Sequence, residues 1–270
     1  MSAPPSAEAK FASAISTESD TEAAIAEVCR SVADGLAGSA DLAMVFVSPH
    51  HAPDFGSIAA AACRALSTQN LLGCTGESIV GTGQELESRP AISLWAARLP
   101  GTRVRTMHLE LARTPEGGTF VGWPDELHDQ WPAGASLLVL AEPFSFPADA
   151  LLQRLNDDRP GVAVMGGMAS GGGAPGENRL MLGEREIEQG AVAALIDGDV
   201  RVRPVVSQGC RPIGKPMVIT KADRNVIYEV GGKPPLAVLR ELFPTLSPAE
   251  QKSVERGVHI GRVTDEYREE

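Results

Sequence analysis

The chain has little of several features that define common protein classes. Aromatic residues make up only 4% of its 270 residues, so the core must depend on Ala, Val, Leu and Ile. Acidic residues outnumber Lys and Arg by 35 to 24, and the net charge of −11 argues against a nucleic-acid groove. No apolar run approaches the ~20 residues that a membrane-spanning helix needs. We therefore expect neither nucleic acid nor a membrane as a partner.

Cysteine and targeting signals are also sparse. The four cysteines (Cys29, Cys63, Cys74 and Cys210) form no CxxC pair, and the amino-terminal MSAPPSAEAKFAS has no apolar leader core. These two absences predict reduced thiols in a cytoplasmic protein. The chain also has no P-loop, no GxGxxG opening a helix and no metal-ligand spacing, so we expect no cofactor and no metal.

What the chain does contain is one pattern that recurs. Residues 41–110 read DLAMVFVSP, then LLGCTG, then AISLWAARLPGTRVRTMHLE, and residues 135–208 read ASLLVLAEP, VAVMGGMASGG and GAVAALIDGDVRVRPVVSQ. Three landmark pairs, Pro49 with Pro143, Gly73 with Gly166 and Gly101 with Gly198, are 94, 93 and 97 residues apart. We interpret this as two tandem repeats, with a ligand site in the cleft between them.

Each repeat predicts a strand, a helix, a second strand and then a meander of strands. Helical spacing of apolar residues predicts helices over 21–36, 55–66 and 147–155, the first capped by Ser19 or Asp20. Short apolar runs predict strands, including 43–47, 71–74, 136–140, 162–165 and 200–207. A strand–helix–strand step favours a parallel crossover. The expected fold class is therefore mixed α/β, with related mixed sheets covered by helices.

The carboxyl-terminal part predicts a smaller set of elements. Strands are expected at 217–220 and 226–229, and helices at 236–242 and 247–254, the last with a capping box from Ser247 and Glu250.

Several separated motifs carry a family resemblance. The stretches FASAIS, MVFVSPHHAPDF, LLGCTGESIVGTGQELESRPAISLWAARLPG, MGGMASGG and VVSQGCRPIGKPMVIT resemble FIST proteins, an intracellular signal-transduction family. The resemblance covers residues 11–230 and implies an N-terminal FIST domain. It implies a sensory or regulatory domain that binds small ligands such as amino acids, without a settled enzymatic activity.

The resemblance also implies domain boundaries. We expect a disordered segment at 1–10, the FIST N-terminal domain at 11–230, and the start of a truncated C-terminal FIST region at 231–270.

Two glycine-containing loops at equivalent strand ends are the first candidates for a ligand site. The loop Cys74-Thr75-Gly76-Glu77-Ser78 corresponds to the run from Gly166 and Gly167 through Ser170 to Gly173. Glycine exposes backbone N–H groups that can hold a carboxylate or phosphate. The alternative is a tight turn that needs glycine only for its geometry, and both interpretations stay open.

Other candidate groups flank these loops. His50 follows the first strand of its repeat, and Gln208, Cys210 and Arg211 close the second repeat, where the planar Arg211 fork suits a carboxylate. The predicted ligand site comprises His50, Cys74, Thr75, Glu77, Ser78, Gly166, Gly167, Ser170, Gln208, Cys210 and Arg211.

Three functions remain open at this point. The first is a non-catalytic sensor of a small molecule, an amino acid or a related metabolite, with a signalling protein as a further partner. The second is a thiol-dependent enzyme whose nucleophile is Cys74 or Cys210, because each lies beside glycine at the end of a predicted strand. The third is a protein-interaction scaffold.

Overall fold

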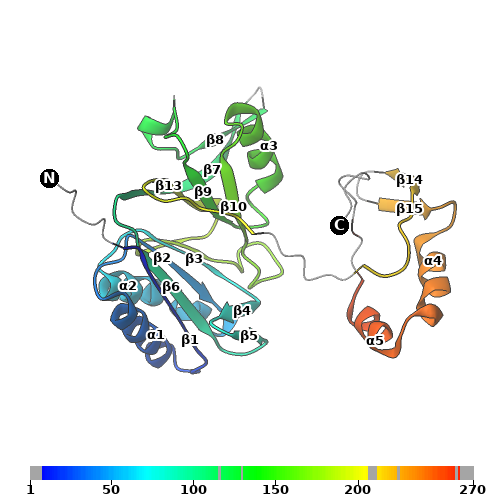
Figure 1. Ribbon diagram of the computed structural model, residues 1–270, viewed down its shortest axis with the longest axis horizontal. Helices are drawn as coiled ribbons and strands as arrows, with labels where there is room; N and C mark the ends of the chain where they lie inside the picture. Colours follow the sequence, from blue (N-terminus) through cyan, green and yellow to red (C-terminus); the bar gives the residue numbers. More distant parts are fainter. Residues whose placement is uncertain are drawn as a thin grey trace. The chain divides into compact units, whose positions relative to one another are not determined.

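The computed structural model describes residues 8–114, 117–128, 130–205, 212–223, 226–258 and 261. The chain forms two compact units, Met1–Pro204 and Val205–Glu270. The first unit contains two large sheets and three helices, and the second contains one hairpin and two helices (Figure 1).

The first sheet has six strands in the order β1-β6-β2-β3-β11-β12. Only β2 and β3 run parallel, and the other neighbouring strands are antiparallel. The strands are β1 (Lys10–Ser16), β2 (Leu42–Val47), β3 (Leu71–Thr75), β6 (Ile92–Arg98), β11 (Leu180–Leu182) and β12 (Arg185–Ile187). A separate hairpin, β4 (Ser78–Gly81) with β5 (Gln84–Glu87), follows β3.

The second sheet has five strands in the order β10-β9-β13-β7-β8. Its one parallel pair is β9 with β10. The strands are β7 (Thr102–Thr114), β8 (Gly117–Val121), β9 (Ser136–Ala141), β10 (Ala163–Met168) and β13 (Ala191–Gly198). A short 3₁₀ turn, Asp125–Leu127, lies between β8 and β9.

Helices complete the parallel crossovers and bury the outer faces of the sheets. Helices α1 (Thr21–Leu36) and α2 (Phe55–Leu66) cover the first sheet, and α3 (Ala148–Asp158) lies against the second (Figure 1). The start of α1 is fixed by the Asp20 side chain, whose Oδ1 accepts a hydrogen bond from Ala23 N at 2.8 Å. Val28, Val32 and Ile58 from these helices are fully buried in the first core cluster.

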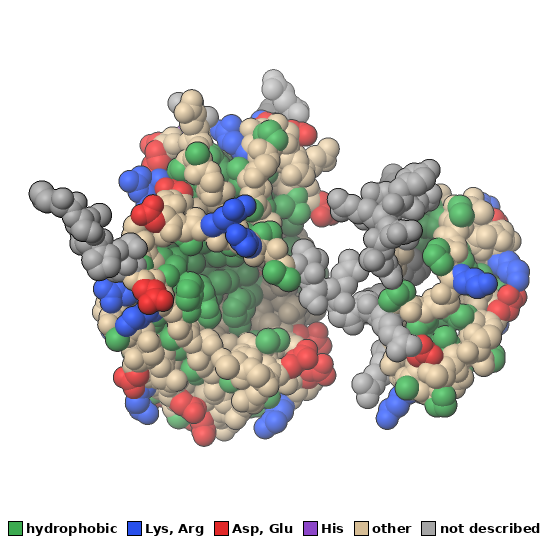
Figure 2. Space-filling view, viewed as in Figure 1, with side chains coloured by type: hydrophobic (Ala, Val, Ile, Leu, Met, Phe, Trp, Pro, Cys, Tyr) green, Lys and Arg blue, Asp and Glu red, His purple; other side chains and the backbone are tan. Residues whose placement is uncertain are grey.

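The inner faces of the two sheets share a third hydrophobic cluster. Leu72 and Cys74 from β3 meet Leu140 from β9 and Val192 from β13 there. Part of this interior is open, because Figure 2 shows a hollow lined by hydrophobic side chains between the two sheets.

The second unit has no interior of this kind among its described residues. It contains β14 (Ile219–Asp223), β15 (Val226–Val230), α4 (Pro235–Leu242), a 3₁₀ turn (Phe243–Thr245) and α5 (Pro248–Arg256). No described side chain in it is buried, and even the apolar Val218 is 72% exposed. The predicted capping box is confirmed, since Ser247 accepts from Glu250 N and Glu250 accepts from Ser247 N.

Most predicted elements are confirmed, and the mixed α/β class is correct. One strand prediction is wrong: residues 200–205 form no strand, and 206–207 lie outside the described residues. Val200 and Val202 pack against the third hydrophobic cluster while Arg201 and Arg203 stay exposed. This half-burial produces a strand-like alternation without a pairing partner. No strand was predicted at β1, β5, β8 or β12.

The tandem repeat stays a prediction. Both sheets do contain a parallel pair joined through a helix, and in both the closing strand pairs antiparallel with the first member of that pair. The sheets do not divide the chain at the predicted repeat boundaries, however. Most of β7 comes from the predicted first repeat and lies in the second sheet, and β11 and β12 come from the predicted second repeat and lie in the first.

Candidate functional site

The carboxyl ends of β3 and β10 lie close enough for direct bonding between the segments that follow them. Ser170 N donates to the Thr75 carbonyl at 3.1 Å, and Glu77 N donates to Ser170 Oγ at 3.2 Å. In α/β sheets, ligands commonly bind beyond the carboxyl ends of parallel strands. The two loops that the sequence singled out therefore form one structure.

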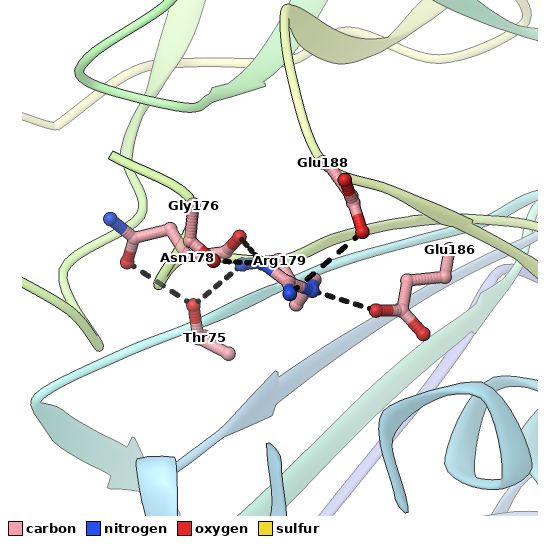
Figure 3. A network of polar contacts seen from close by, with 6 residues as sticks. All are labelled: Thr75, Gly176, Asn178, Arg179, Glu186 and Glu188. Carbon is pink, nitrogen blue, oxygen red and sulfur yellow. Dashed lines mark hydrogen bonds and ion pairs between the residues drawn. The ribbon is translucent and has the colours of Figure 1, made fainter. Parts of the chain in front are cut away.

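The segment from Ser170 to Arg179, called here the glycine loop, is held by a buried asparagine. Asn178 is fully buried, and its Oδ1 accepts from Gly172 N at 3.0 Å and from Thr75 Oγ1 at 3.3 Å. Its Nδ2 donates to the Gly172 carbonyl at 3.2 Å, and Thr75 Oγ1 accepts from Arg179 N at 3.1 Å. Figure 3 shows Thr75 between Asn178 and Arg179, so this side chain ties the glycine loop to β3.

Close packing explains the glycines at two positions of this loop. A Cβ on Gly171 would lie 2.6 Å from the Thr75 Cβ, and one on Gly172 would lie 2.3 Å from the Glu177 Cβ. Any larger residue would push the loop away from β3 or break its own turn.

Arg179 ends the glycine loop and connects it to β12. Its Nε lies 2.8 Å from Glu186 Oε1, and its Nη2 lies 3.8 Å from Glu188 Oε1. Its Nη1 donates to the carbonyls of Gly176 and Asn178. The side chain remains 25% exposed, so the guanidinium is oriented by the protein and still reachable from solvent (Figure 3).

A cleft of about 470 Å³ opens between the glycine loop and the 3₁₀ helix Pro49–Asp54 that follows β2. One wall is apolar and the other combines glycine backbone with two opposite charges. Its lining residues are Pro49, Ala52, Pro53, Gly171, Gly172, Gly176, Glu177 and Arg179. The Glu177 Oε2 accepts from Gly173 N at 2.8 Å and from Ala174 N at 3.0 Å, which fixes this carboxylate beside the cleft.

The apolar wall is anchored by His51. This residue is fully buried, and its Nδ1 lies 2.9 Å from Thr21 Oγ1 at the start of α1. Burial lowers the pKa of His51 below its ordinary value, and neighbouring His50 lowers it further. Its Nε2 is buried with no hydrogen-bond partner among the described residues. His51 therefore serves as a neutral anchor for the short helix.

The structure brings together only some of the predicted site residues. Thr75, Glu77 and Ser170 meet at the junction of the two loops. Ser78 begins β4 and is exposed, and exposed His50 neighbours Pro49 without lining the cleft. Gly166 and Gly167 lie within β10 and do not line the cleft either. Gln208, Cys210 and Arg211 lie outside the described residues.

Cys74 is in the hydrophobic interior rather than in the cleft. It is 5% exposed, and burial raises the pKa of its thiol to about 12. Burial likewise raises the pKa values of Cys29 and Cys63 to about 11. A nucleophilic cysteine needs a stabilised thiolate, so these environments disfavour that role for all three.

Sequence reasoning missed three residues that shape the site: Glu177, Asn178 and Arg179. The predicted loop stopped at Gly173, and the role of a carboxylate-binding arginine was assigned to Arg211. A usable signal was present in GENR, a polar and charged run directly before the apolar LML of β11.

The described residues include neither a metal-binding cluster nor a membrane-spanning helix. No group of three or more His, Cys, Asp or Glu side chains there is placed to share a metal ion. No described helix is long and apolar enough to cross a membrane.

Comparison with known proteins identifies relatives. Residues 41–233 match the FIST N domain. Uncharacterized proteins from two strains of Mycobacterium tuberculosis are each 38% identical to this chain over 256 residues, which is 94% of this chain and 64% of the relative. An uncharacterized protein of Mycobacterium bovis is 36% identical over 259 residues, with the same two shares. The chain thus spans 64% of the length of these relatives. No solved structure matches.

Proposed function

Because this chain belongs to the FIST N domain family, we propose that it is an intracellular, cytoplasmic sensory domain that binds a small ligand for signal transduction. The observation that carries the proposal is the joining of the β3 and β10 loops beside a cleft with fixed polar groups. Ligand pockets commonly have volumes of about 300–1,000 Å³ and combine an apolar lining with a few positioned polar groups.

The lining favours an amino acid or a related metabolite as the ligand. Glu177 and Arg179 place opposite charges on one wall, which suits a molecule that carries both an ammonium and a carboxylate. Pro49, Ala52 and Pro53 offer the facing wall to an apolar side chain. This binding role needs no chemical step, so the proposal is a non-enzymatic one.

Thermal-shift screening tests the proposal. The twenty amino acids and a set of small anionic metabolites are screened against the wild type, Arg179→Ala and Arg154→Ala. Arg154 is the matched control, because it pairs with Asp158 on α3 and does not line the cleft. A ligand at about 100 times its Kd should stabilise the wild type by about 2.7 kcal/mol.

The expected result is a shift that Arg154→Ala keeps and Arg179→Ala loses. Absence of any shift across the screen, or an equal shift in both variants, would contradict the proposed site.

Iodoacetamide labelling across pH tests the alternative of a thiol-dependent enzyme. A thiol that reacts with a pKa well below the usual ~8.5 would favour that alternative.

A protein partner for signalling is the second part of the proposal. It is supported by the second unit, in which Val218, Leu236 and Tyr228 are at least half exposed and no described side chain is buried. Pull-down of the full chain with and without a ligand found in the screen separates a sensor from a constitutive scaffold. A sensor should change its partner binding when the ligand is added.

A further inference from the structure

Arg179 has donors that the protein does not use. A guanidinium carries five N–H groups. The Nε faces Glu186 at 2.8 Å, and Nη1 donates to the carbonyls of Gly176 and Asn178. Nη2 makes no hydrogen bond to the described residues, and its ion-pair contact with Glu188 Oε1 is 3.8 Å long. Nη2 is therefore oriented, charged and short of an acceptor.

Glu186 and Glu188 differ in how they engage this guanidinium. Glu186 lies at hydrogen-bond distance, and its side chain is 38% exposed. Glu188 lies beyond hydrogen-bond distance, and its side chain is 68% exposed. A solvent-exposed pair at this separation contributes little free energy. Glu186 thus positions Arg179, whereas Glu188 is held near Nη2 only weakly. Both glutamates lie beside Arg179 in Figure 3.

The charges around the cleft restrict which anion could replace Glu188. Glu177, Glu186 and Glu188 place three carboxylates near one arginine. Arg179 is the one cation among the described lining residues, so a phosphate dianion would be repelled by these carboxylates more strongly than a singly charged carboxylate would be. A carboxylate accompanied by an ammonium is better suited, because the ammonium can face Glu177, whose Oε1 makes no hydrogen bond to the described residues.

We propose that the ligand of this cleft carries a carboxylate that replaces Glu188 at Arg179 Nη2, which makes Glu188 a competing group that sets the affinity for that ligand. The proposal rests on the proposed function, because it concerns the same cleft. It assigns opposite effects to the two glutamates. Removing the Glu188 charge frees Nη2 for the ligand, whereas removing the Glu186 charge releases the side chain that must be held in place.

The test compares each amino acid found in the screen with its carboxamide, in which an uncharged amide replaces the carboxylate. Inorganic phosphate is a third probe. Each is titrated calorimetrically into the wild type, Glu188→Gln, Glu186→Gln and Glu184→Gln. Glu184 is the matched control for net charge, because it is an exposed carboxylate of the same hairpin and is not an Arg179 partner.

We expect the acid to bind and the amide and phosphate to bind at least tenfold more weakly. Glu188→Gln should tighten binding of the acid about two- to fivefold, the range implied by a weak exposed pair. Glu186→Gln should weaken it, and Glu184→Gln should leave it within twofold of the wild type.

Three outcomes would overturn the inference while leaving small-ligand binding intact. One is equal affinity for the acid and its amide, and another is the same change for Glu188→Gln and Glu184→Gln. The third is tighter binding of phosphate than of the acid. If none of the probes binds, both this inference and the proposed function fail.

Discussion

Each of the two parallel strand pairs of this protein is connected through a helix, but the two pairs differ in burial. Every residue of β3 is buried, whereas the last three residues of β10 are exposed. The helices differ in the same direction: α2 buries six residues and α3 buries two. The strand–helix–strand unit β2–α2–β3, called here the first step, is therefore more deeply buried than the unit β9–α3–β10, called here the second step.

The glycine loop lies where these two regions of different burial meet. The glycine loop follows the partly exposed strand β10, but its bonds through Thr75, Asn178 and Arg179 fix it to the buried strand β3. One wall of the cleft comes from the end of β2, whose short helix is anchored by buried His51. Substitutions in the two steps should therefore have unequal effects.

The largest difference is expected between the two helices. Phe55→Ala removes a fully buried ring from α2 and should lower the free energy of unfolding by about 3–5 kcal/mol. Leu152→Ala in α3 affects a side chain that is 43% exposed and should cost well under 1 kcal/mol. Urea denaturation of both variants measures this. Similar losses would remove the distinction between the two steps.

A second, smaller difference is expected between glycines of the two strands. A Cβ on Gly73 would lie 2.6 Å from the Val45 carbonyl oxygen, so Gly73→Ala should cost about 2–3 kcal/mol. A Cβ on Gly167 meets nothing within 4 Å, so Gly167→Ala should change stability by about 0.5 kcal/mol or less. Thermal melting of the matched pair gives the result. A Gly167 variant as unstable as the Gly73 variant would contradict the open character of β10.

The next largest effect is expected at Thr75, which ties the glycine loop to β3. Thr75→Val keeps the side-chain volume but removes the Oγ1 that contacts Asn178 and accepts from Arg179 N, so it should cost about 1–2 kcal/mol. It should also reduce ligand-induced stabilisation, since the glycine loop loses its tie to β3. Thr119→Val is the matched control, because Thr119 is exposed on β8 and does not line the cleft. Full retention of the ligand shift in Thr75→Val would show that the loop is held by other contacts.

The smallest effect is expected in the pH dependence of the free energy of unfolding, through His51 in the short helix that follows β2. The pKa of His51 is lowered in the folded protein, so below the ordinary value of 6.5 the unfolded chain binds more protons than the folded one. The free energy of unfolding should therefore fall as the pH drops through 6.5 towards the lowered pKa, and the His51 contribution should be complete above 6.5. His51→Gln should flatten this part of the stability profile, and His128→Gln, at an exposed histidine that does not shift the pKa of His51, should leave it steep. A steep profile in His51→Gln would assign the titration to another group.

Local patterns allowed much of the fold to be predicted. The helices α1 and α2 were predicted with their observed bounds, because their buried residues follow helical periodicity and the signals for both ends lie in the neighbouring sequence. Pairing between distant strands was not predicted, since nothing within the three residues of β11 encodes its partner β3. Strand β1 was missed for a related reason: it is a partly exposed edge strand whose hydrogen bonds go to β6.

The candidate site was predicted in outline and missed in its chemistry. The matching positions of the two glycine-containing loops pointed to Thr75, Glu77 and Ser170, which do meet. The polar wall of the cleft depends on Arg179 and Asn178, whose contacts include residues far away in sequence. Asn178 in particular has no local signal, because its importance arises from complete burial beside Thr75.

The pairing of β11 with β3 has a consequence for the order in which the protein is made. The first sheet needs residues up to Ile187, so it stays incomplete while the whole intervening second-sheet segment from β7 to β10 leaves the ribosome. The Thr75–Arg179 contact alone spans 104 residues. Contacts of such long range slow folding and leave strand edges unpaired in the meantime. The edge of β3 therefore stays unpaired in the nascent chain until the late arrival of β11 closes it.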